Sequence, residues 1–160
     1  KGPIFFRHLR NGLDNKEFYC YKFRSMAPNN RADEYSATRN DLRVTRVGKF
    51  IRKTSIDELP QFYNVFFGSM SVVGPRPHMV KHTNEYANTV DKYMVRHFIK
   101  PGITGLAQVR GYRGEIESEF DILNRTKFDI FYIENWSLFL DLKIILQTIL
   151  NAFRGDDKAY

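Results

Sequence analysis

The sequence predicts an α+β fold in which a small N-terminal β-hairpin packs with several short helices and an amphipathic helix closes the chain. Two β-rich runs near the start are separated by a group of turn-forming residues, which is the pattern of a hairpin. Residues 137–153 instead repeat apolar side chains at helical spacing. At 160 residues the chain is long enough for a single domain with its own core, and no repeat divides it.

The predicted hairpin consists of residues 4–10 and 17–26, joined by the turn formers of residues 11–16. Side chains alternate between the two faces of a strand, so Lys22 and Arg24 share one face of the second strand with apolar neighbours. Two interpretations of that face stay open. It is either a partly buried positive wall or the exposed edge of a sheet with scattered charges.

A loop and several helices are predicted after the hairpin. Residues 27–41 are polar and include Pro28, which predicts a loop with one helical turn at most. Gly68 is expected to end one of the helices that follow. The helices are expected over residues 42–52, 56–67, 78–97 and 115–135, and the third of these is interrupted.

The most informative segment is residues 55–61 (SIDELPQ), which place the adjacent carboxylates Asp57 and Glu58 at a predicted helix start. Nearby cations lower carboxylate pKa values, so Arg52 and Lys53 are expected to help hold both acids ionised. An ionised carboxylate in a basic frame can meet a phosphate substrate and still act as nucleophile or metal ligand. This pair is therefore the first candidate for a catalytic site.

A capping box is the alternative interpretation of the acid pair. In a capping box, Ser55 and Glu58 would satisfy backbone N–H groups at the helix start, and Asp57 would only complement the helix dipole. Pro60 argues against a plain cap, because a proline beyond the first turn removes a helical hydrogen bond and bends the helix entry. From these residues alone, the cap and the catalytic site remain equally open.

A second candidate segment surrounds Arg76. Residues 70–73 form a short, apolar run that predicts a buried strand, and Gly74 ends it. Pro75 and Pro77 then fix the backbone on both sides of Arg76, which would hold its guanidinium ready for a phosphate. Taken alone, the segment more simply predicts a surface turn with a solvated arginine.

A third candidate is the glycine-rich segment of residues 100–111. Its three glycines let a ligand approach the backbone closely, and Gln108 and Arg110 would supply polar contacts. The glycine spacing excludes phosphate-loop and dinucleotide-binding fingerprints. By itself this segment is more typical of a structural loop.

Together, these segments resemble the bacterial sugar transferase family, the monotopic phosphoglycosyl transferases. The similarity runs from about residue 5 to about residue 155, and the pieces occur in the order found in that family. Agreement over several ordered motifs is far more specific than any one of them. The pieces are residues 22–26 (KFRSM), 46–61 (RVGKFIRKTSIDELPQ), 70–77 (MSVVGPRP), 100–111 (KPGITGLAQVRG) and 135–137 (NWS).

The resemblance implies an enzyme that transfers a sugar 1-phosphate from a UDP-sugar to a polyprenyl phosphate such as undecaprenyl phosphate, with release of UMP. This is the first membrane step in the synthesis of surface polysaccharides. The resemblance implies that Asp57 is the nucleophile, and that Glu58 binds Mg²⁺ together with Asp57 or manages charge. Binding of substrate and phosphate is implied for Lys22, Arg24, Arg52, Arg76, Gln108 and Arg110.

Composition limits the partners of the chain. The net charge of +7, from 25 basic and 18 acidic residues, favours anionic partners such as nucleic acid, lipid headgroups or nucleotide diphosphates. Cys20 is the only cysteine, which excludes an intrachain disulfide, and the four histidines form no convincing ligand set. No recognised nucleic-acid motif is present, so no nucleic-acid partner is expected. A non-catalytic basic module that binds nucleic acid, or a membrane scaffold, is the alternative function.

The last predicted helix bears on membrane association. No stretch reaches the ~20 apolar residues needed to cross a bilayer. The apolar arc of residues 137–153 either lies among lipid headgroups or packs on the domain. The arc consists of Leu138, Leu142, Ile145, Leu146, Ile149, Leu150 and Phe153. The resemblance favours the membrane and implies a membrane-associated monotopic catalytic domain at the cytoplasmic face of the bacterial inner membrane, with its N-terminal hydrophobic anchor outside this chain.

Overall fold

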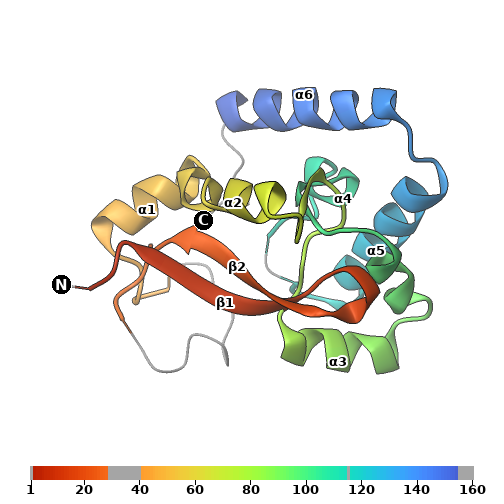
Figure 1. Cartoon of the computed structure of the whole chain (residues 1–160), viewed down its shortest axis with the longest axis horizontal. Coiled ribbons are helices and arrows are strands. Elements are labelled where there is room, and N and C mark those ends of the chain that lie inside the picture. The colour runs from red at the N-terminus through yellow and green to blue at the C-terminus, as the bar shows by residue number, and fades with distance from the viewer. Residues whose placement is uncertain (1, 29–40, 115, 155–160) are drawn as a thin grey trace.

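The computed structural model describes residues 2–28, 41–114 and 116–154, and these form the predicted mixed α+β fold (Figure 1). A β-hairpin comes first, short helices and a small parallel sheet follow, and two longer helices end the described chain. Most of the loop predicted over residues 27–41 lies outside the described residues.

The hairpin is confirmed, with β1 (Phe5–Asn11) pairing antiparallel with β2 (Glu17–Phe23). Its turn contains Asp14 and Asn15, both at positive φ, which these two residue types tolerate better than most. The second strand ends at Phe23 rather than at residue 26, because the chain then leaves the hairpin to pair with the segment that precedes the first helix. The long ribbon lies across the lower middle of Figure 1.

A second, smaller sheet joins two distant parts of the chain. The buried strand predicted at residues 70–73 is β3 (Ser71–Val73), and it pairs in parallel with β4 (Gly102–Thr104). The backbones touch so closely that a Cβ atom on Gly102 would collide with the backbone nitrogen of Gly74. The segment of residues 100–111 therefore contains a strand rather than only a loop, and its glycines permit close strand contact.

Two predicted helices begin later than expected, each at a residue whose side chain caps it. The first, α1 (Arg46–Lys53), begins after Thr45, whose hydroxyl accepts a hydrogen bond from Gly48 N at 2.9 Å. The long helix α5 (Glu119–Glu134) begins after Ser118, which forms a capping box with Asp121. Residue 115, where this second helix was expected to start, lies outside the described residues.

The other predicted helices are divided or shortened. The helix expected over residues 56–67 is a 3-10 turn, Ile56–Glu58, followed by α2 (Gln61–Phe66). The interrupted helix over residues 78–97 is α3 (Val80–Thr89) followed by a 3-10 segment, Tyr93–Phe98. A short helix, α4 (Leu106–Val109), follows β4, and α6 (Leu138–Arg154) is the last element.

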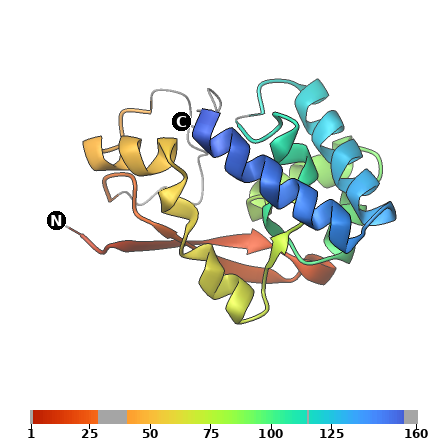
Figure 2. The ribbon, with the colours of Figure 1, turned by 90° about the horizontal axis from the view of Figure 1, so that it is seen from above.

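One hydrophobic core cluster lies between the small sheet and the last three helices, and a second contains Val90, Tyr93 and Ile122. Val73 of β3 packs with Leu106, Tyr132 and Ile144, one residue from each of α4, α5 and α6. Figure 2 shows α6 crossing over the molecule with α5 beside it. The core thus ties the end of the chain to the strand that leads into Arg76.

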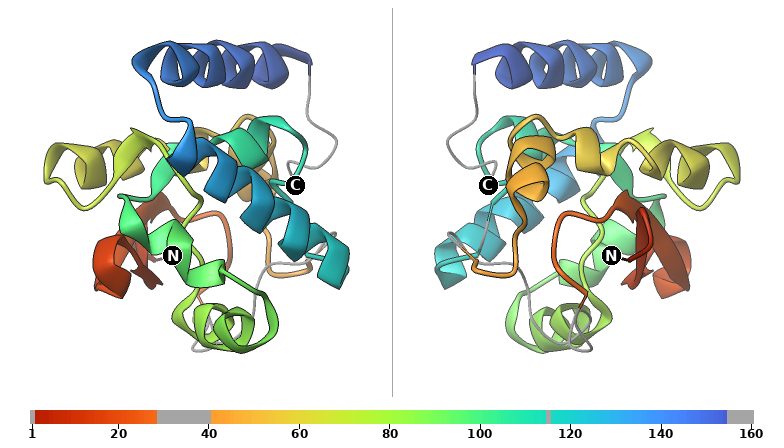
Figure 3. Two further views of the ribbon diagram at one scale, coloured as in Figure 1. Left: turned by 90° about the vertical axis from the view of Figure 1, so that its right-hand side faces the viewer. Right: turned by 90° about the vertical axis from the view of Figure 1, so that its left-hand side faces the viewer.

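The outward face of α6 is apolar and exposed, although Ile144 on its opposite side is almost fully buried. Figure 3 shows α6 along one edge of the molecule, with the rest of the fold on one side of it only. The exposed apolar side chains are Leu138, Phe139, Leu142, Leu146, Ile149 and Leu150. Most of the predicted arc therefore faces away from the domain, and the packing alternative holds only for Ile145, which contacts the core. The side chain of Phe153 lies outside the described ones. In the part of the chain that the structure describes, every helix is too short or too polar to span a bilayer.

Candidate active site

Asp57 and Glu58 lie on a tight turn between α1 and α2. Ser55 adopts a left-handed conformation, with φ 58 and ψ 13, and this turns the chain into the 3-10 turn that carries both acids. Leu59 N donates to Ile56 O at 3.1 Å, as a 3-10 turn requires. Pro60 then forms the N-cap position of α2, so the bent helix entry predicted from this proline is present.

The capping-box interpretation of the acid pair is wrong. Ser55 makes no side-chain capping hydrogen bond, because its left-handed backbone is not the extended geometry of an N-cap. The Glu58 carboxylate binds three described cations instead. Its Oε1 accepts from Lys22 Nζ at 2.8 Å and Arg76 Nη2 at 2.7 Å, and its Oε2 accepts from Arg113 Nη2 at 2.8 Å. We call these four residues the carboxylate cage.

The cage is buried at its centre and open at its rim. Glu58 is 6% exposed and Asp57 8% exposed, whereas the side chains of Lys22, Arg76 and Arg113 are 19%, 23% and 21% exposed. A guanidinium carries five N–H donors, so the two arginines keep donors beyond those that reach Glu58. These partly exposed cations are suited to bind an anionic ligand next to Asp57.

The pKa values of the two acids move in opposite directions. Burial alone would raise the pKa of Glu58, but Arg76, Lys22 and Arg113 outweigh it and hold that pKa well below its ordinary value. Burial raises the pKa of Asp57, and Glu58 adds to the rise, against Lys22, Arg52 and Arg76. The expectation that cations hold both pKa values low is therefore wrong for Asp57. A carboxylate with a raised pKa is more basic, which suits a nucleophile.

Lys22 reaches Glu58 because α2 is fastened to the hairpin. The buried side chain of Asn64 on α2 accepts from Tyr21 N at 3.0 Å and donates to Tyr19 O at 2.8 Å. This places β2 alongside the turn that carries the acids. Of the two interpretations of the β2 face, the partly buried positive wall is confirmed at Lys22. The role of Asn64 was missed in the sequence, where an isolated asparagine gives no signal of a distant partner.

The two arginines of the cage come from loops that follow buried elements. Arg76 lies between its two prolines directly after β3, and it binds Glu58 rather than lying in a solvated surface turn. Arg113 follows α4 and the chain reversal at Gly111, whose φ is 91. Arg113 was missed, because nothing in the sequence separates it from the other basic residues of the chain. The parallel pairing of β3 with β4 places the segments that follow both strands on the same side of the small sheet, and Arg113 reaches Glu58 from there.

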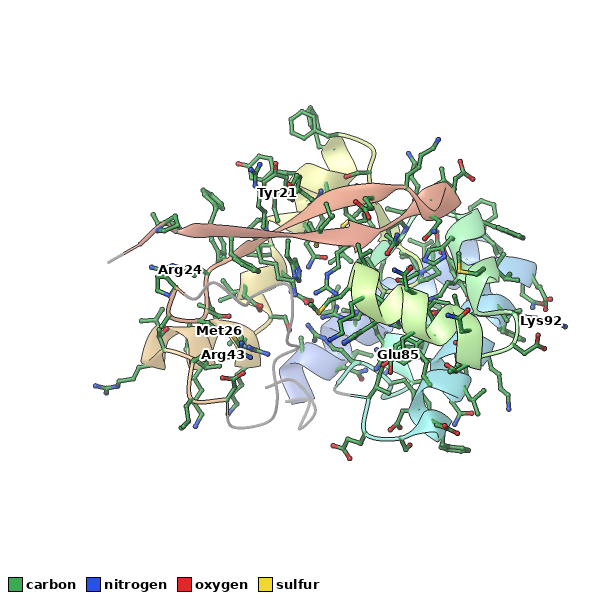
Figure 4. The ribbon with its side chains drawn as sticks, turned by 90° about the horizontal axis from the view of Figure 1, so that it is seen from below. Tyr21, Arg24, Met26, Arg43, Glu85 and Lys92 are labelled. Carbon is green, nitrogen blue, oxygen red and sulfur yellow. The ribbon has the colours of Figure 1, made fainter. Side chains whose placement is uncertain are left out.

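The remaining predicted phosphate-binding cations do not contact Glu58. Arg24 donates to Pro3 O at 2.6 Å and Gly2 O at 3.1 Å. Figure 4 shows Arg24 at the same end of the hairpin as Met26, away from α3. Arg52 acts at longer range, through its charge on Asp57. Arg24 is thus tied to the N-terminal backbone, while Arg52 remains near the acid pair.

The glycine-rich segment contributes structure to the site. Gln108 is buried and donates to Ile103 O at 3.1 Å, so it braces its own segment. Arg110, at the end of α4, is exposed. The structure does not bring either residue to Glu58, and their binding roles stay predictions.

Asp57 fits a magnesium ion better than Glu58 does. Magnesium prefers oxygen ligands and commonly takes one or two carboxylates together with substrate phosphates. Both oxygens of Glu58 already accept from cations, and a divalent ion there would meet three positive charges. Within the described ranges, no group of three or more His, Cys, Asp or Glu side chains is arranged around a common metal position. A magnesium ion would therefore depend on Asp57 and on oxygens of a bound substrate.

Known proteins similar to this chain are sugar transferases. The family described as "Bacterial sugar transferase" matches residues 1–155. A "UDP-glucose:undecaprenyl-phosphate glucose-1-phosphate transferase" of Klebsiella pneumoniae is 53% identical over 154 residues, covering 96% of this chain and 33% of the relative. A protein of the same name from Escherichia coli (strain K12) is 49% identical over 153 residues, covering 95% of this chain and 33% of the relative.

A relative named for another sugar is also similar. The "UDP-N-acetylgalactosamine-undecaprenyl-phosphate N-acetylgalactosaminephosphotransferase" of Aeromonas hydrophila is 44% identical over 156 residues, covering 96% of this chain and 36% of the relative. The chain spans about a third of the length of these three relatives.

Proposed function

We propose, because this chain belongs to the bacterial sugar transferase family, that it transfers a sugar 1-phosphate from a UDP-sugar to undecaprenyl phosphate and releases UMP. This reaction would begin the assembly of a surface polysaccharide. The observation that carries the proposal is the carboxylate cage, in which three cations surround Glu58 directly beside Asp57. The names of the K. pneumoniae and E. coli relatives make UDP-glucose the first donor to test.

In the first half of the reaction, Asp57 is the nucleophile. One oxygen of its carboxylate attacks the phosphorus that bears the sugar and forms an acyl phosphate bond. The bond between that phosphorus and the bridging oxygen breaks, and UMP leaves with the bridging oxygen and its electron pair. Burial and the raised pKa support this role, because they make the Asp57 carboxylate more reactive than a solvated one.

In the second half, an oxygen of undecaprenyl phosphate attacks the phosphorus held on Asp57. The acyl phosphate bond breaks, Asp57 is restored as a carboxylate, and the lipid carries a diphosphate-linked sugar. A carboxylate nucleophile thus divides one difficult displacement into two easier ones. The cations of the cage support both halves, because phosphoryl transfer depends mainly on positioning and on neutralising charge.

Glu58 is proposed to organise the cage. Its depressed pKa keeps it ionised, so Lys22, Arg76 and Arg113 are held by one carboxylate in a fixed arrangement. Their remaining donors face the diphosphate of the UDP-sugar. Asp57 and the diphosphate oxygens are the proposed ligands of Mg²⁺, which supplies further charge neutralisation when bound.

Intact mass and UMP release test the nucleophile. Wild-type protein incubated with UDP-glucose and Mg²⁺, without lipid, is expected to release UMP and to gain the mass of one hexose phosphate. Asp57→Asn should show no adduct and should lose about 10⁴-fold or more of the transfer rate, because the attacking oxygen anion is gone. Asp91→Asn, which changes an exposed carboxylate, is the matched control and should behave as wild type.

Two outcomes would contradict this function. Turnover that survives in Asp57→Asn would exclude Asp57 as nucleophile. Failure of the wild type with every UDP-sugar tested, combined with tight and salt-sensitive binding of DNA, would favour the alternative of a basic nucleic-acid-binding module.

A membrane surface is the proposed partner of α6, at the cytoplasmic face of the bacterial inner membrane as the resemblance implies. The outward face of this helix exposes six large apolar side chains, an area that soluble monomers rarely leave uncovered. Trp136, which is exposed just before α6, suits the level of the lipid headgroups. The net charge of +7 complements anionic lipids. An amphipathic helix lying in the interface combines these features.

Sedimentation with vesicles tests this partner. Wild-type protein is expected to sediment with vesicles of anionic phospholipid, and Leu142→Glu combined with Leu146→Glu should weaken that binding about 10-fold or more. Ala87→Glu combined with Asn88→Glu adds the same charge to exposed positions of α3 and serves as the control. Equal weakening by both double variants would mean that net charge, rather than the α6 face, governs binding.

A further inference from the structure

Behind the carboxylate cage lies a second group of charged and polar side chains that the proposed reaction does not use. We call it the buried layer. It consists of His78, Tyr93, Arg96, Arg125 and Asp129, each no more than 6% exposed. Tyr93 and Arg96 belong to the 3-10 segment Tyr93–Phe98, Arg125 and Asp129 belong to α5, and His78 lies just before α3.

Arg96 holds the backbone of Arg76. Its Nη2 donates to Arg76 O at 2.8 Å and to Asp129 Oδ2 at 2.7 Å. Its Nη1 donates to the Tyr93 hydroxyl at 3.0 Å, and its guanidinium lies 5.0 Å from the centre of the Tyr93 ring. With contacts on several sides, the guanidinium of Arg96 is confined, and it confines the carbonyl of Arg76 in turn.

Arg125 holds the backbone next to Arg113, the other arginine of the cage. Its Nη2 donates to Gly114 O at 2.9 Å, and its Nη1 lies 3.4 Å from His78 Nε2. Gly114 directly follows Arg113, so this bond holds the backbone next to the residue that binds Glu58 Oε2. Each arginine of the cage therefore has a buried arginine that grips its own carbonyl or the adjacent one.

We propose that Arg96 and Arg125 are positioning residues that aim Arg76 and Arg113 at the reacting phosphate. Arg96 acts through Arg76, and Arg125 acts through Arg113. This inference rests on the proposed function, since it assigns the aim of the cage arginines to the transfer reaction. Arg96 and Arg125 would thus influence the rate of sugar-phosphate transfer although neither contacts Glu58.

The energetics of the layer support a role beyond stability. The layer contains two guanidinium groups and one carboxylate, so one buried positive charge has no ionised partner within it. Burial, Arg96 and Arg76 together lower the pKa of Arg125 to about 10, which reflects how unfavourable that charge is at this site. Buried ionic groups are often replaceable by apolar residues without loss of stability. Their presence here is better explained by the two carbonyls that they hold.

A double-mutant cycle tests the proposal. Arg125→Lys keeps the charge but cannot reach both His78 and Gly114 as a guanidinium does, and it should lower the rate of transfer about 10- to 100-fold. In an Arg113→Gln background the same change should cost less than about 3-fold, because the arginine it aims is absent. In an Arg76→Gln background it should keep its full effect. Lys127→Gln, on the exposed side of α5, is the control and should change nothing.

A purely structural role of Arg125 predicts a different pattern. It would give equal losses in the Arg113→Gln and Arg76→Gln backgrounds, and that result would overturn the proposal. If Arg125→Lys does not fold, Arg96→Lys is tested in its place, with its effect expected to vanish in Arg76→Gln and to persist in Arg113→Gln. Failure of both lysine variants to fold would also overturn the proposal, because it would assign the two arginines to the stability of the fold rather than to the aim of Arg76 and Arg113.

Binding of inorganic pyrophosphate separates this inference from the proposed function. If the wild type transfers no sugar phosphate, the proposed function fails, and the same cycle is measured by calorimetry with pyrophosphate. Coupling of Arg125 to Arg113, but not to Arg76, in pyrophosphate binding would uphold the positioning role by itself. If the wild type is active and Arg125→Lys has equal effects in the Arg113→Gln and Arg76→Gln backgrounds, the positioning role is excluded and the proposed function is retained.

Discussion

The carboxylate cage and the buried layer use the same residue types for different purposes. Both place more cations than carboxylates together: three cations bind Glu58 in the cage, and two arginines lie with Asp129 in the layer. The cage cations keep about a fifth of their side-chain surface exposed, whereas Arg96 and Arg125 keep at most 4%. Exposure therefore decides whether a guanidinium can offer donors to a ligand or only to neighbouring groups of the protein.

This difference predicts opposite results for substitutions in the two groups. A partly exposed ion pair contributes little to stability, because water replaces the lost partner. A buried charge that loses its partner is left without any compensation. Changes to the partly exposed cations of the cage should thus alter the reaction, and loss of charge in the layer should alter the fold.

Among substitutions in the two groups, the largest change in free energy is expected at Asp129, which is 2% exposed and binds Arg96. Asp129→Asn removes the carboxylate charge and leaves two buried guanidinium groups without a counter-charge. The free energy of unfolding should fall by about 3–5 kcal/mol. Urea denaturation measured by circular dichroism gives this value, and Asp91→Asn, at an exposed position, should stay within about 0.5 kcal/mol of wild type.

A fall of less than about 1 kcal/mol in the free energy of unfolding of Asp129→Asn would contradict the distinction between the cage and the buried layer. It would show that water or a local rearrangement compensates the buried arginines, so that the layer behaves as the cage does.

A smaller change in free energy is expected at Arg113, where the substitution should affect the transition state of the reaction and not the stability of the fold. Arg113→Gln removes one of three cations from Glu58 and one donor from the proposed phosphate site. The rate of transfer should fall about 10²-fold, equivalent to about 2.7 kcal/mol of transition-state stabilisation. The free energy of unfolding should change by less than about 1 kcal/mol, because Lys22 and Arg76 still bind Glu58.

Steady-state kinetics and urea denaturation of the same preparation measure both quantities for Arg113→Gln. Lys81→Gln, at an exposed position of α3, is the matched control. A variant that loses stability in proportion to its activity would place Arg113 with the buried layer and remove the distinction between the two groups.

Much of the candidate site was predictable because its signals are local. Asp57 and Glu58 are adjacent in the chain, Pro60 bends the helix entry within two residues of them, and the strand alternation that places Lys22 spans a few residues. The prolines around Arg76 act on its own backbone. Each of these features depends on neighbours in sequence, and each was expected in advance.

The residues that were missed depend on contacts between distant segments. Arg113 reaches Glu58 across 55 positions, Asn64 binds the hairpin across more than 40, and Arg96 binds Asp129 across 33. The two pKa values of the acid pair also differ because of burial, which depends on how the hairpin and helices pack around the turn. Composition and periodicity carry no information on such pairings.

The amino-acid order alone was enough to establish the hairpin, the adjacent acids, the proline-flanked arginine and an apolar arc on the last helix, because short-range geometry and residue chemistry specify each of them. Tertiary packing decided between the structural alternatives that the sequence left open. It removed the capping box, assigned Glu58 to three cations, turned the apolar arc of α6 outward and placed a buried layer behind the cage. The physical reason is that burial, charge pairing and exposure are properties of the surroundings of a side chain, and those surroundings exist only in the folded chain.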